Sequence, residues 1–204
     1  MKKSEYQNYF AGKKIIPILL VFMLTSLPIR SFANEFSGTD QILSQLSIEE
    51  KIGQLMMVAI DDQSLSLNTN EWLKNYHIGG VILLGKNVSD LNQTAELIQS
   101  LQTTVTSSNL PLFIAVDQEG GKVSRFSFPD PITMKSQTDI KNESDAYAVG
   151  LARGRLLKNL GVNINFSPVI DLGTSKDQFI FSRTFNGDVI NVTKLGLSLA
   201  KGYR

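Results

Sequence analysis

The sequence predicts a parallel α/β fold. Short apolar runs, bounded by glycine, proline or acidic residues, alternate with segments whose apolar residues recur at helical spacing. The apolar runs are continuous rather than alternating with polar residues, which is typical of strands in parallel βαβ units that are buried on both faces. A doubly wound open sheet and a (β/α)₈ barrel both satisfy this pattern.

The first strands and helices are expected between residues 47 and 105. Ser47 and Glu50 have the spacing of a capping box, so a short helix should begin at Ser47. Strands are expected over 56–60 and 79–85, with a short helix over 70–76 between them. Ser89 is expected to cap the next helix. One face of that helix carries Leu91, Ala95, Ile98, Leu101 and Val105.

The second half of the chain continues the alternation. A third strand is expected over 112–116, and a helix over 142–160 that Gly161 ends. A fourth strand is expected within 163–172. A last helix should begin near Asp188 and run almost to the C-terminus, so about four βα units are expected.

The composition is that of an ordinary folded domain. The chain has 204 residues, 42% of them hydrophobic and 19% charged, with no cysteine and one histidine. It excludes collagen-like, coiled-coil and disulfide-stapled classes. The net charge of +1 gives no electrostatic basis for nucleic-acid binding. Because zinc-ligand clusters and glycine-rich nucleotide motifs are missing from the sequence, we expect neither a metal nor a cofactor.

Residues 1–33 have the pattern of a signal peptide. They hold five basic residues and one acidic residue, a net charge of +4, which leaves −3 for the remainder of a chain whose total is +1. An apolar run over 15–27 is followed by Ser31-Phe32-Ala33, a small-x-small cleavage site. An uncleaved membrane anchor is the alternative, but the run is shorter than the roughly 20 residues that span a bilayer, which favours a cleaved signal. We therefore expect 34–204 to be exported to the periplasm or the medium, without membrane association after cleavage.

Polar residues follow the predicted strands, where ligands bind in parallel α/β folds. They are Asp61, Asp62, Lys86, Asn87, Asp117, Gln118, Glu119 and Asp171. Such a set suits a neutral ligand rich in hydroxyl groups. Gly120 and Gly121 allow a sharp turn after Glu119, and Arg125 could return toward Asp117 as a donor. A turn with solvated carboxylates is the alternative. His77 precedes the second strand and is expected at the opposite end of the sheet.

Several stretches together resemble glycoside hydrolase family 3. They are E-E-K-I-G-Q-L at 49–55, G-G-V-I-L at 79–83, A-V-D-Q-E-G-G-K-V-S-R-F at 115–126, G-V-N-I-N-F-S-P-V-I-D-L at 161–172 and S-R-T-F at 182–185. The resemblance covers nearly all of 41–204. The V-D-Q-E-G-G-x-V-x-R-F form is most similar to the β-N-acetylhexosaminidase branch.

The resemblance implies a fold and an activity. The fold is the amino-terminal half of a TIM-barrel-like (β/α)₈ domain, spanning 34–204. The activity is hydrolysis of O-glycosyl bonds by a retaining β-N-acetylhexosaminidase, with N-acetylglucosamine-containing glycans such as peptidoglycan as the carbohydrate partner. It also implies that Asp117, Arg125 and Arg183 bind the substrate. Asp171 closes the predicted fourth strand and is expected to support the same pocket.

The family's catalytic residues are expected beyond residue 204. Its K-H-x-P-G-H-G segment, with the catalytic histidine, would follow the last helix, and the nucleophilic aspartate would come later still. We therefore expect a truncated gene product, an incomplete sequence or half of a split protein, which alone is poorly stable and without turnover. Asp117 and Glu119 form a carboxylate pair, but the resemblance assigns Asp117 to binding.

Three other interpretations remain open. One is a β-glucosidase of the same family. Another is a non-catalytic exported module that binds sugar, since a leader followed by βαβ units also fits solute-binding proteins. The third is a half-barrel that completes itself by association.

Overall fold

A computed structural model describes residues 38–105, 110–127, 131–173 and 175–204. The predicted signal peptide, 1–33, lies outside the described residues. The chain divides into two units, one ending at Gln45 and one comprising Leu46–Arg204. Within the first, the structure describes helix α2 (Gly38–Gln45). In the described ranges, none of the helices is both long enough and apolar enough to cross a membrane.

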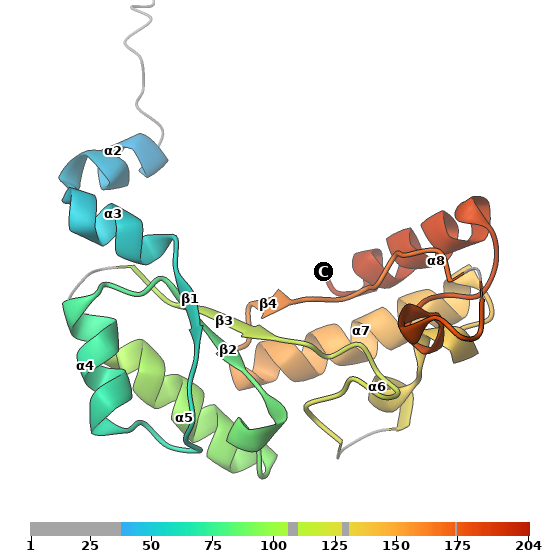
Figure 1. The fold of residues 1–204 in the computed structure, drawn as a ribbon, viewed down its shortest axis with the longest axis horizontal. Coiled ribbons are helices and arrows are strands. Elements are labelled where there is room, and N and C mark those ends of the chain that lie inside the picture. The colour runs from blue at the N-terminus through green and yellow to red at the C-terminus, as the bar shows by residue number, and fades with distance from the viewer. Residues whose placement is uncertain (1–37, 106–109, 128–130, 174) are drawn as a thin grey trace, which may run out of the picture. The chain divides into compact units, whose positions relative to one another are not determined.

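The second unit is built on a parallel sheet of four strands. These are β1 (Met57–Ala59), β2 (Gly80–Leu83), β3 (Phe113–Val116) and β4 (Ile164–Asn165), in the spatial order β1-β2-β3-β4 (Figure 1). Each strand falls within its predicted range. A doubly wound sheet reverses its strand order at a switch point, whereas a barrel keeps neighbours in chain order. The observed order is therefore that of a barrel segment.

Helices connect the strands, although the helix predicted over 70–76 begins at Leu67 and the short helix Pro131–Met134 was not predicted. The helices are α3 (Ile48–Gln54), α4 (Leu67–Asn75), α5 (Leu91–Thr104), α6 (Pro131–Met134), α7 (Glu143–Leu160) and α8 (Val189–Gly202). Short 3₁₀ turns are η1 (Gly85–Asn87), η3 (Gln137–Asp139) and η4 (Phe179–Ser182). The capping box of α3 is confirmed, because Ser47 Oγ accepts from Glu50 N at 3.1 Å and the Glu50 carboxylate accepts from Ser47 N at 2.8 Å. Gly161 ends α7 at φ 88°, also as predicted.

The predicted cap of α5 is wrong by one residue. The N-cap is Asp90, whose Oδ1 accepts from Gln93 N at 2.9 Å. Ser89 lies just outside the helix, and its backbone N–H donates to Gln93 Oε1 at 2.9 Å. Both residue types cap well, and the chain takes the extended cap conformation at the aspartate.

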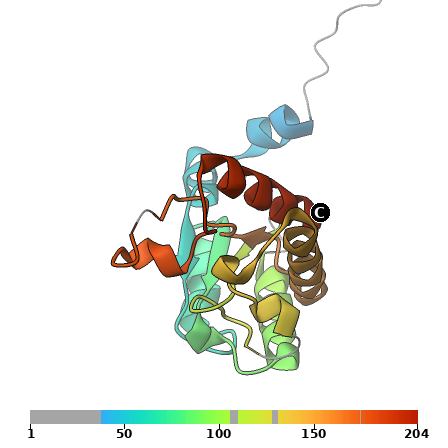
Figure 2. The same ribbon diagram turned by 90° about the vertical axis from the view of Figure 1, so that its right-hand side faces the viewer.

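Two apolar clusters hold the unit together. In the first, Leu73 of α4, Leu101 of α5 and Leu157 of α7 pack against the sheet at Val81 and Ile114. The second lies where α7 and α8 run side by side (Figures 1 and 2). It contains Ile140, Ala146, Val149, Phe185, Val192, Leu195 and Leu199. The helices therefore fix the strands from one side, and α8 fixes the segment that leads into it.

The other face of the sheet is less covered. The strand register aligns Ala59, Ile82, Ala115 and Ile164 in one row across the four strands. Ala59 is exposed and Ile82 and Ile164 are half-buried, whereas Ala115 is fully buried; Phe113, two residues before Ala115, is 53% exposed. Such rows are what a barrel interior stacks in layers.

Strand β4 occupies only two residues of the segment 163–172 in which it was expected. Its backbone pairing with β3 ends where Phe166 N donates to Val116 O at 2.9 Å. Beyond this point the backbone is bonded by a side chain and no longer by the neighbouring strand. Gln137 accepts from Val169 N at 2.9 Å and donates to Val169 O at 2.8 Å. The part of this segment around Val169 is therefore held by an amide side chain and not by strand pairing.

Candidate functional site

A tight turn follows β3 and forms one wall of the candidate site. The backbone N–H groups of Glu119 and Gly120 both donate to Val123 O, at 2.9 and 3.1 Å. Gly120 has φ 85°, and a Cβ there would lie 2.0 Å from Arg153 Nη2. Glycine is required at this position both by its backbone conformation and by this close approach.

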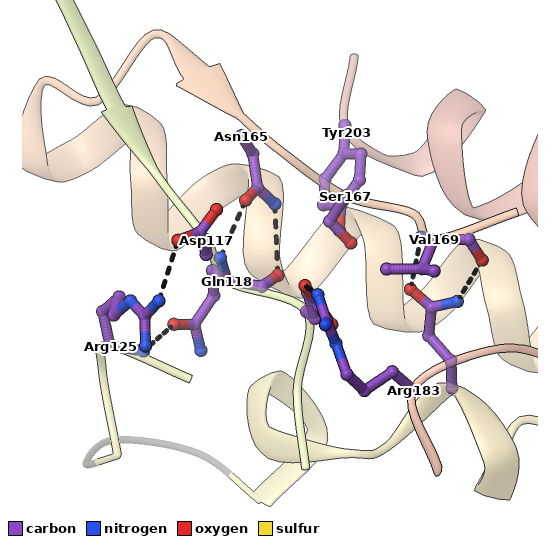
Figure 3. A network of polar contacts seen from close by, with 10 residues as sticks. Asp117, Gln118, Arg125, Asn165, Ser167, Val169, Arg183 and Tyr203 are labelled. Atoms are coloured by element: carbon purple, nitrogen blue, oxygen red, sulfur yellow. Dashed lines mark hydrogen bonds and ion pairs between the residues drawn. The ribbon is translucent and has the colours of Figure 1, made fainter. Parts of the chain in front are cut away.

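Gln118 closes the loop behind the turn. Its side chain is fully buried, and its Oε1 accepts from Arg125 N at 2.8 Å and from Phe126 N at 3.0 Å. Its Nε2 donates to Phe126 O at 3.2 Å. On the other side, the backbone of Gln118 is held by Asn165, whose Oδ1 accepts from Gln118 N at 2.9 Å (Figure 3). Gln118 therefore joins the loop to β4 and returns Arg125 to the strand end.

Arg125 and Asp117 form the first ion pair of the site, which we call the near pair. Arg125 Nη2 donates to Asp117 Oδ2 at 2.8 Å (Figure 3). Their side chains are 23% and 24% exposed, so both still reach solvent. The prediction that Arg125 returns toward Asp117 is confirmed.

Arg183 and Glu119 form the second ion pair, the far pair. Arg183 Nε donates to Glu119 Oε2 at 2.9 Å, and Nη2 donates to Oε1 at 2.5 Å. The Glu119 side chain is only 4% exposed. The guanidinium also lies over the Phe179 ring, 5.3 Å from its centroid. The hydrogen bonds to Glu119 raise the pKa of Arg183, and the charges of Asp117 and Asp171 add to this rise while burial opposes it.

The structure thus brings Asp117, Arg125 and Arg183 to the carboxyl end of β3. Asp171, which the sequence placed in the same pocket, is exposed and close enough for its charge to raise the pKa of Arg183. The three residues that the resemblance implied, and Asp171, therefore gather at one end of the sheet.

The polar residues after β1 and β2 have other partners. Asp61 and Lys86 form an exposed ion pair with each other. Asn87 is fully buried, and its Nδ2 donates to Ile60 O at 3.1 Å and Asp62 O at 2.9 Å. Asn87 therefore joins the ends of two strands, which is a structural role. In the described ranges there is no group of three or more histidine, aspartate or glutamate side chains arranged to hold a metal ion.

Sequence reasoning missed two buried charges. It named Glu119 as a strand-end carboxylate but did not find its pairing with Arg183, 64 residues away. It also missed Arg153, which is fully buried on α7 beneath the turn, where Nε donates to Thr133 O at 2.8 Å. A signal for Arg153 existed, because it lies four residues after Val149, on the buried face of the helix.

The opposite end of the sheet holds a cavity of about 330 Å³. Its lining combines apolar side chains with Glu50, Lys74 and His77. His77 lies there as expected, with its carbonyl accepting from Gln54 Nε2 at 2.9 Å. In TIM-barrel folds the amino end of the strands contributes to stability, and active sites lie at the carboxyl end. The two ion pairs at the carboxyl end therefore mark the candidate site.

Residues 47–204 match the model of the glycosyl hydrolase family 3 N terminal domain. The chain belongs to this family. The four-stranded sheet is accordingly a segment of a TIM-barrel-like domain, and the predicted fold class is confirmed.

Two curated relatives illustrate the similarity in sequence. The chain is 36% identical over 143 residues to beta-hexosaminidase A of Pseudoalteromonas piscicida, an alignment that covers 66% of this chain and 24% of the relative. It is 31% identical over 183 residues to beta-hexosaminidase LpqI of Mycobacterium tuberculosis, covering 88% of this chain and 45% of the relative. The chain therefore spans about a quarter of one relative and less than half of the other.

Solved structures show the same fold. A family 3 beta-N-acetylglucosaminidase from Paenibacillus sp. str. FPU-7 matches with a TM-score of 0.71 at 28% identity, covering 78% of this chain and 31% of that one. NagZ from Neisseria gonorrhoeae, in complex with N-trifluoroacetyl-D-glucosamine, matches with a TM-score of 0.62 at 27% identity, covering 72% and 45%.

Proposed function

We propose that this chain supplies the sugar-binding part of a retaining β-N-acetylhexosaminidase that hydrolyses O-glycosyl bonds in N-acetylglucosamine-containing glycans such as peptidoglycan. One observation carries the proposal. Two carboxylates and two guanidinium groups form adjacent ion pairs at the carboxyl end of β3. The names of the relatives, beta-hexosaminidase and beta-N-acetylglucosaminidase, support this substrate class over a β-glucosidase.

The chemistry of the two pairs suits a neutral sugar. The carboxylate of Asp117 can accept from sugar hydroxyl groups, and the guanidinium groups of Arg125 and Arg183 can donate to hydroxyl or acyl oxygens. Each cation is already paired, so the local charges balance and the site has no excess charge for a phosphate or a nucleic acid. Partial exposure of both arginines leaves them accessible to a ligand.

Catalysis in this proposal requires residues of the K-H-x-P-G-H-G segment and the later nucleophilic aspartate. Retaining hydrolysis in its usual form places a nucleophile and an acid/base about 5–5.5 Å apart. Glu119 is not a candidate for either role, because both of its oxygens accept bonds from Arg183. The residues described above therefore bind and orient the sugar.

We also propose that the protein is exported after cleavage of residues 1–33. The basic start, the apolar run and the small residues before position 34 support this. N-terminal sequencing of the protein recovered outside the cytoplasm should begin at Asn34. A product that begins at Met1 and pellets with membranes would instead indicate the uncleaved anchor.

Binding to simple sugars tests the proposed substrate. Isothermal titration of the chain with N-acetylglucosamine should give saturable binding that Asp117→Ala weakens about tenfold, the loss expected when a charged hydrogen-bond partner is removed. Glucose is the control ligand, and equal binding of both would favour the β-glucosidase. Binding of N-acetylglucosamine by the protein isolated from its source, without hydrolysis of its 4-nitrophenyl β-glycoside, would favour the non-catalytic module.

A further inference from the structure

We propose that Glu119 is a positioning residue that fixes the orientation of the Arg183 guanidinium, so that one particular edge of this group faces the sugar. This inference rests on the proposed function, because it assigns Arg183 to the sugar. It gives the second carboxylate of the V-D-Q-E-G-G stretch a role in placing another side chain rather than in contacting the substrate.

The geometry of the far pair carries the argument. Glu119 engages the guanidinium side-on, with Oε2 accepting from Nε at 2.9 Å and Oε1 accepting from Nη2 at 2.5 Å. Two parallel bonds between planar groups fix both the position and the rotation of the guanidinium. The edge formed by Nη1 and the second N–H of Nη2 therefore points away from Glu119. This edge presents parallel donors that suit two neighbouring oxygens of a sugar.

Glu119 is itself rigidly held. Its side chain is almost completely buried, and its backbone N–H donates to Val123 O at 2.9 Å within the turn. The preceding residue, Gln118, is held by Asn165 through its backbone and by the loop through its side chain. A carboxylate that is held this rigidly can fix the position of a side chain that comes from a distant segment.

Arg183 depends on this support more than Arg125 does. It directly follows the 3₁₀ turn η4, which reaches the site from 64 residues along the chain. The guanidinium also contacts the face of Phe179, a ring that is 81% exposed. A ring face restrains a guanidinium in the stacking direction but leaves it free to rotate in its plane. Glu119 supplies the contact that stops this rotation.

The test uses the full chain and two variants of Glu119. Glu119→Gln keeps the shape but loses the charge and one acceptor oxygen, and Glu119→Asp keeps the charge but shortens the reach. The matched control is Glu71→Gln, an exposed position on α4. Arginine side-chain Nε–H signals are followed by ¹⁵N NMR, with Arg183→Lys assigning the Arg183 signal. N-acetylglucosamine is the titrant.

We expect the Arg183 Nε–H of the unmodified chain to exchange slowly with water, because it is bonded to a buried carboxylate. In Glu119→Gln the exchange should be faster by about tenfold and sugar affinity should fall by about tenfold, with a smaller loss in Glu119→Asp. The backbone N–H of Arg125, which donates to Gln118, should not change. A general loss of structure would alter both signals, so the selective loss separates positioning from folding.

Two outcomes would overturn the inference. One is an Arg183 Nε–H that exchanges rapidly in the unmodified chain. The other is a Glu119→Gln variant with unchanged exchange or unchanged sugar affinity. If Arg183 is protected by Glu119 but N-acetylglucosamine does not bind the unmodified chain, the proposed function fails while the side-on placement stands.

Discussion

The near pair and the far pair contain the same two kinds of group but are assembled differently. Asp117 and Arg125 are eight residues apart, joined by a loop that Gln118 closes from within. Glu119 and Arg183 are 64 residues apart and meet because helices α7 and α8 pack together and bring η4 to the strand end. The side chains of the near pair are 23% and 24% exposed, whereas the far pair is anchored on a carboxylate that is only 4% exposed.

This difference separates two ways of building a site. Hydrogen bonds within the loop bring the two residues of the near pair together, and solvent limits what the pair contributes to stability. The far pair needs the distant segment to be in place, and its buried carboxylate makes the loss of a partner costly. We therefore expect substitutions at the two pairs to differ in their balance between stability and sugar binding.

The largest effect is expected at Gln118, on which the near pair depends. Gln118→Leu leaves the backbone groups of Arg125 and Phe126 without their partner, so the free energy of unfolding should fall by about 3 kcal/mol. Urea denaturation followed by circular dichroism measures this. Gln99→Leu, at an exposed position of α5, is the control. A loss similar to that of the control would mean that the loop does not need Gln118.

The next largest effect is expected at the far pair. Glu119→Gln should lower the free energy of unfolding by about 2 kcal/mol, because the Arg183 guanidinium loses a buried, charged partner. The same denaturation experiment applies, with Glu71→Gln as the control. An unchanged stability would show that the pair is no stronger than a surface ion pair.

A smaller loss of stability is expected at the near pair. Asp117→Asn should lower the free energy of unfolding by about 0.5–1 kcal/mol, since both partners reach solvent. Its affinity for N-acetylglucosamine should nevertheless fall about tenfold, because the proposed acceptor of sugar hydroxyl groups is lost. Asp61→Asn, in the exposed pair with Lys86, should leave the affinity unchanged. Equal affinity in the two variants would remove Asp117 from the site.

The smallest effect is expected from a local ion pair outside the site. Lys135 Nζ donates to both oxygens of Asp145 at 2.7 Å. Burial opposes the shift, but the hydrogen bonds from Lys135 and from the Lys141 backbone outweigh it and lower the pKa of Asp145. A lowered pKa gives stability that is present above the ordinary aspartate value and is lost below about pH 4.

Asp145→Asn should therefore flatten the fall in melting temperature on acidification below about pH 4. Asp177→Asn, an exposed position, should not alter it. Identical acid profiles for both variants would contradict the expectation. Asp117 and Arg125 are separated by a similar number of residues in the chain. Comparing the two pairs therefore separates the effect of the site from that of an ordinary local ion pair.

The sequence predicted the features that depend on local patterns. The order of strands and helices, the capping box at Ser47 and the end of α7 at Gly161 follow from periodicity and from capping chemistry. The return of Arg125 to Asp117 also follows from the sequence, because Gly120 and Gly121 allow a sharp turn and Arg125 comes soon after them. Each of these involves residues within a few positions of one another.

The features that escaped prediction depend on tertiary contacts. After β4, the Gln137 side chain bonds the backbone of Val169, which is 32 residues away in the chain. No sequence pattern indicates that Glu119 and Arg183 are in contact, because their contact depends on how α8 packs. Only the resemblance in S-R-T-F pointed to Arg183, and it said nothing of the carboxylate that holds it.

The most direct test of the account is an NMR titration of the chain with N-acetylglucosamine, observed at assigned backbone and arginine signals. The account predicts saturable shifts centred on Asp117, Arg125 and Arg183, at the carboxyl end of the sheet. An absence of binding would contradict it. So would shifts confined to the cavity at the opposite end, beside Glu50, Lys74 and His77.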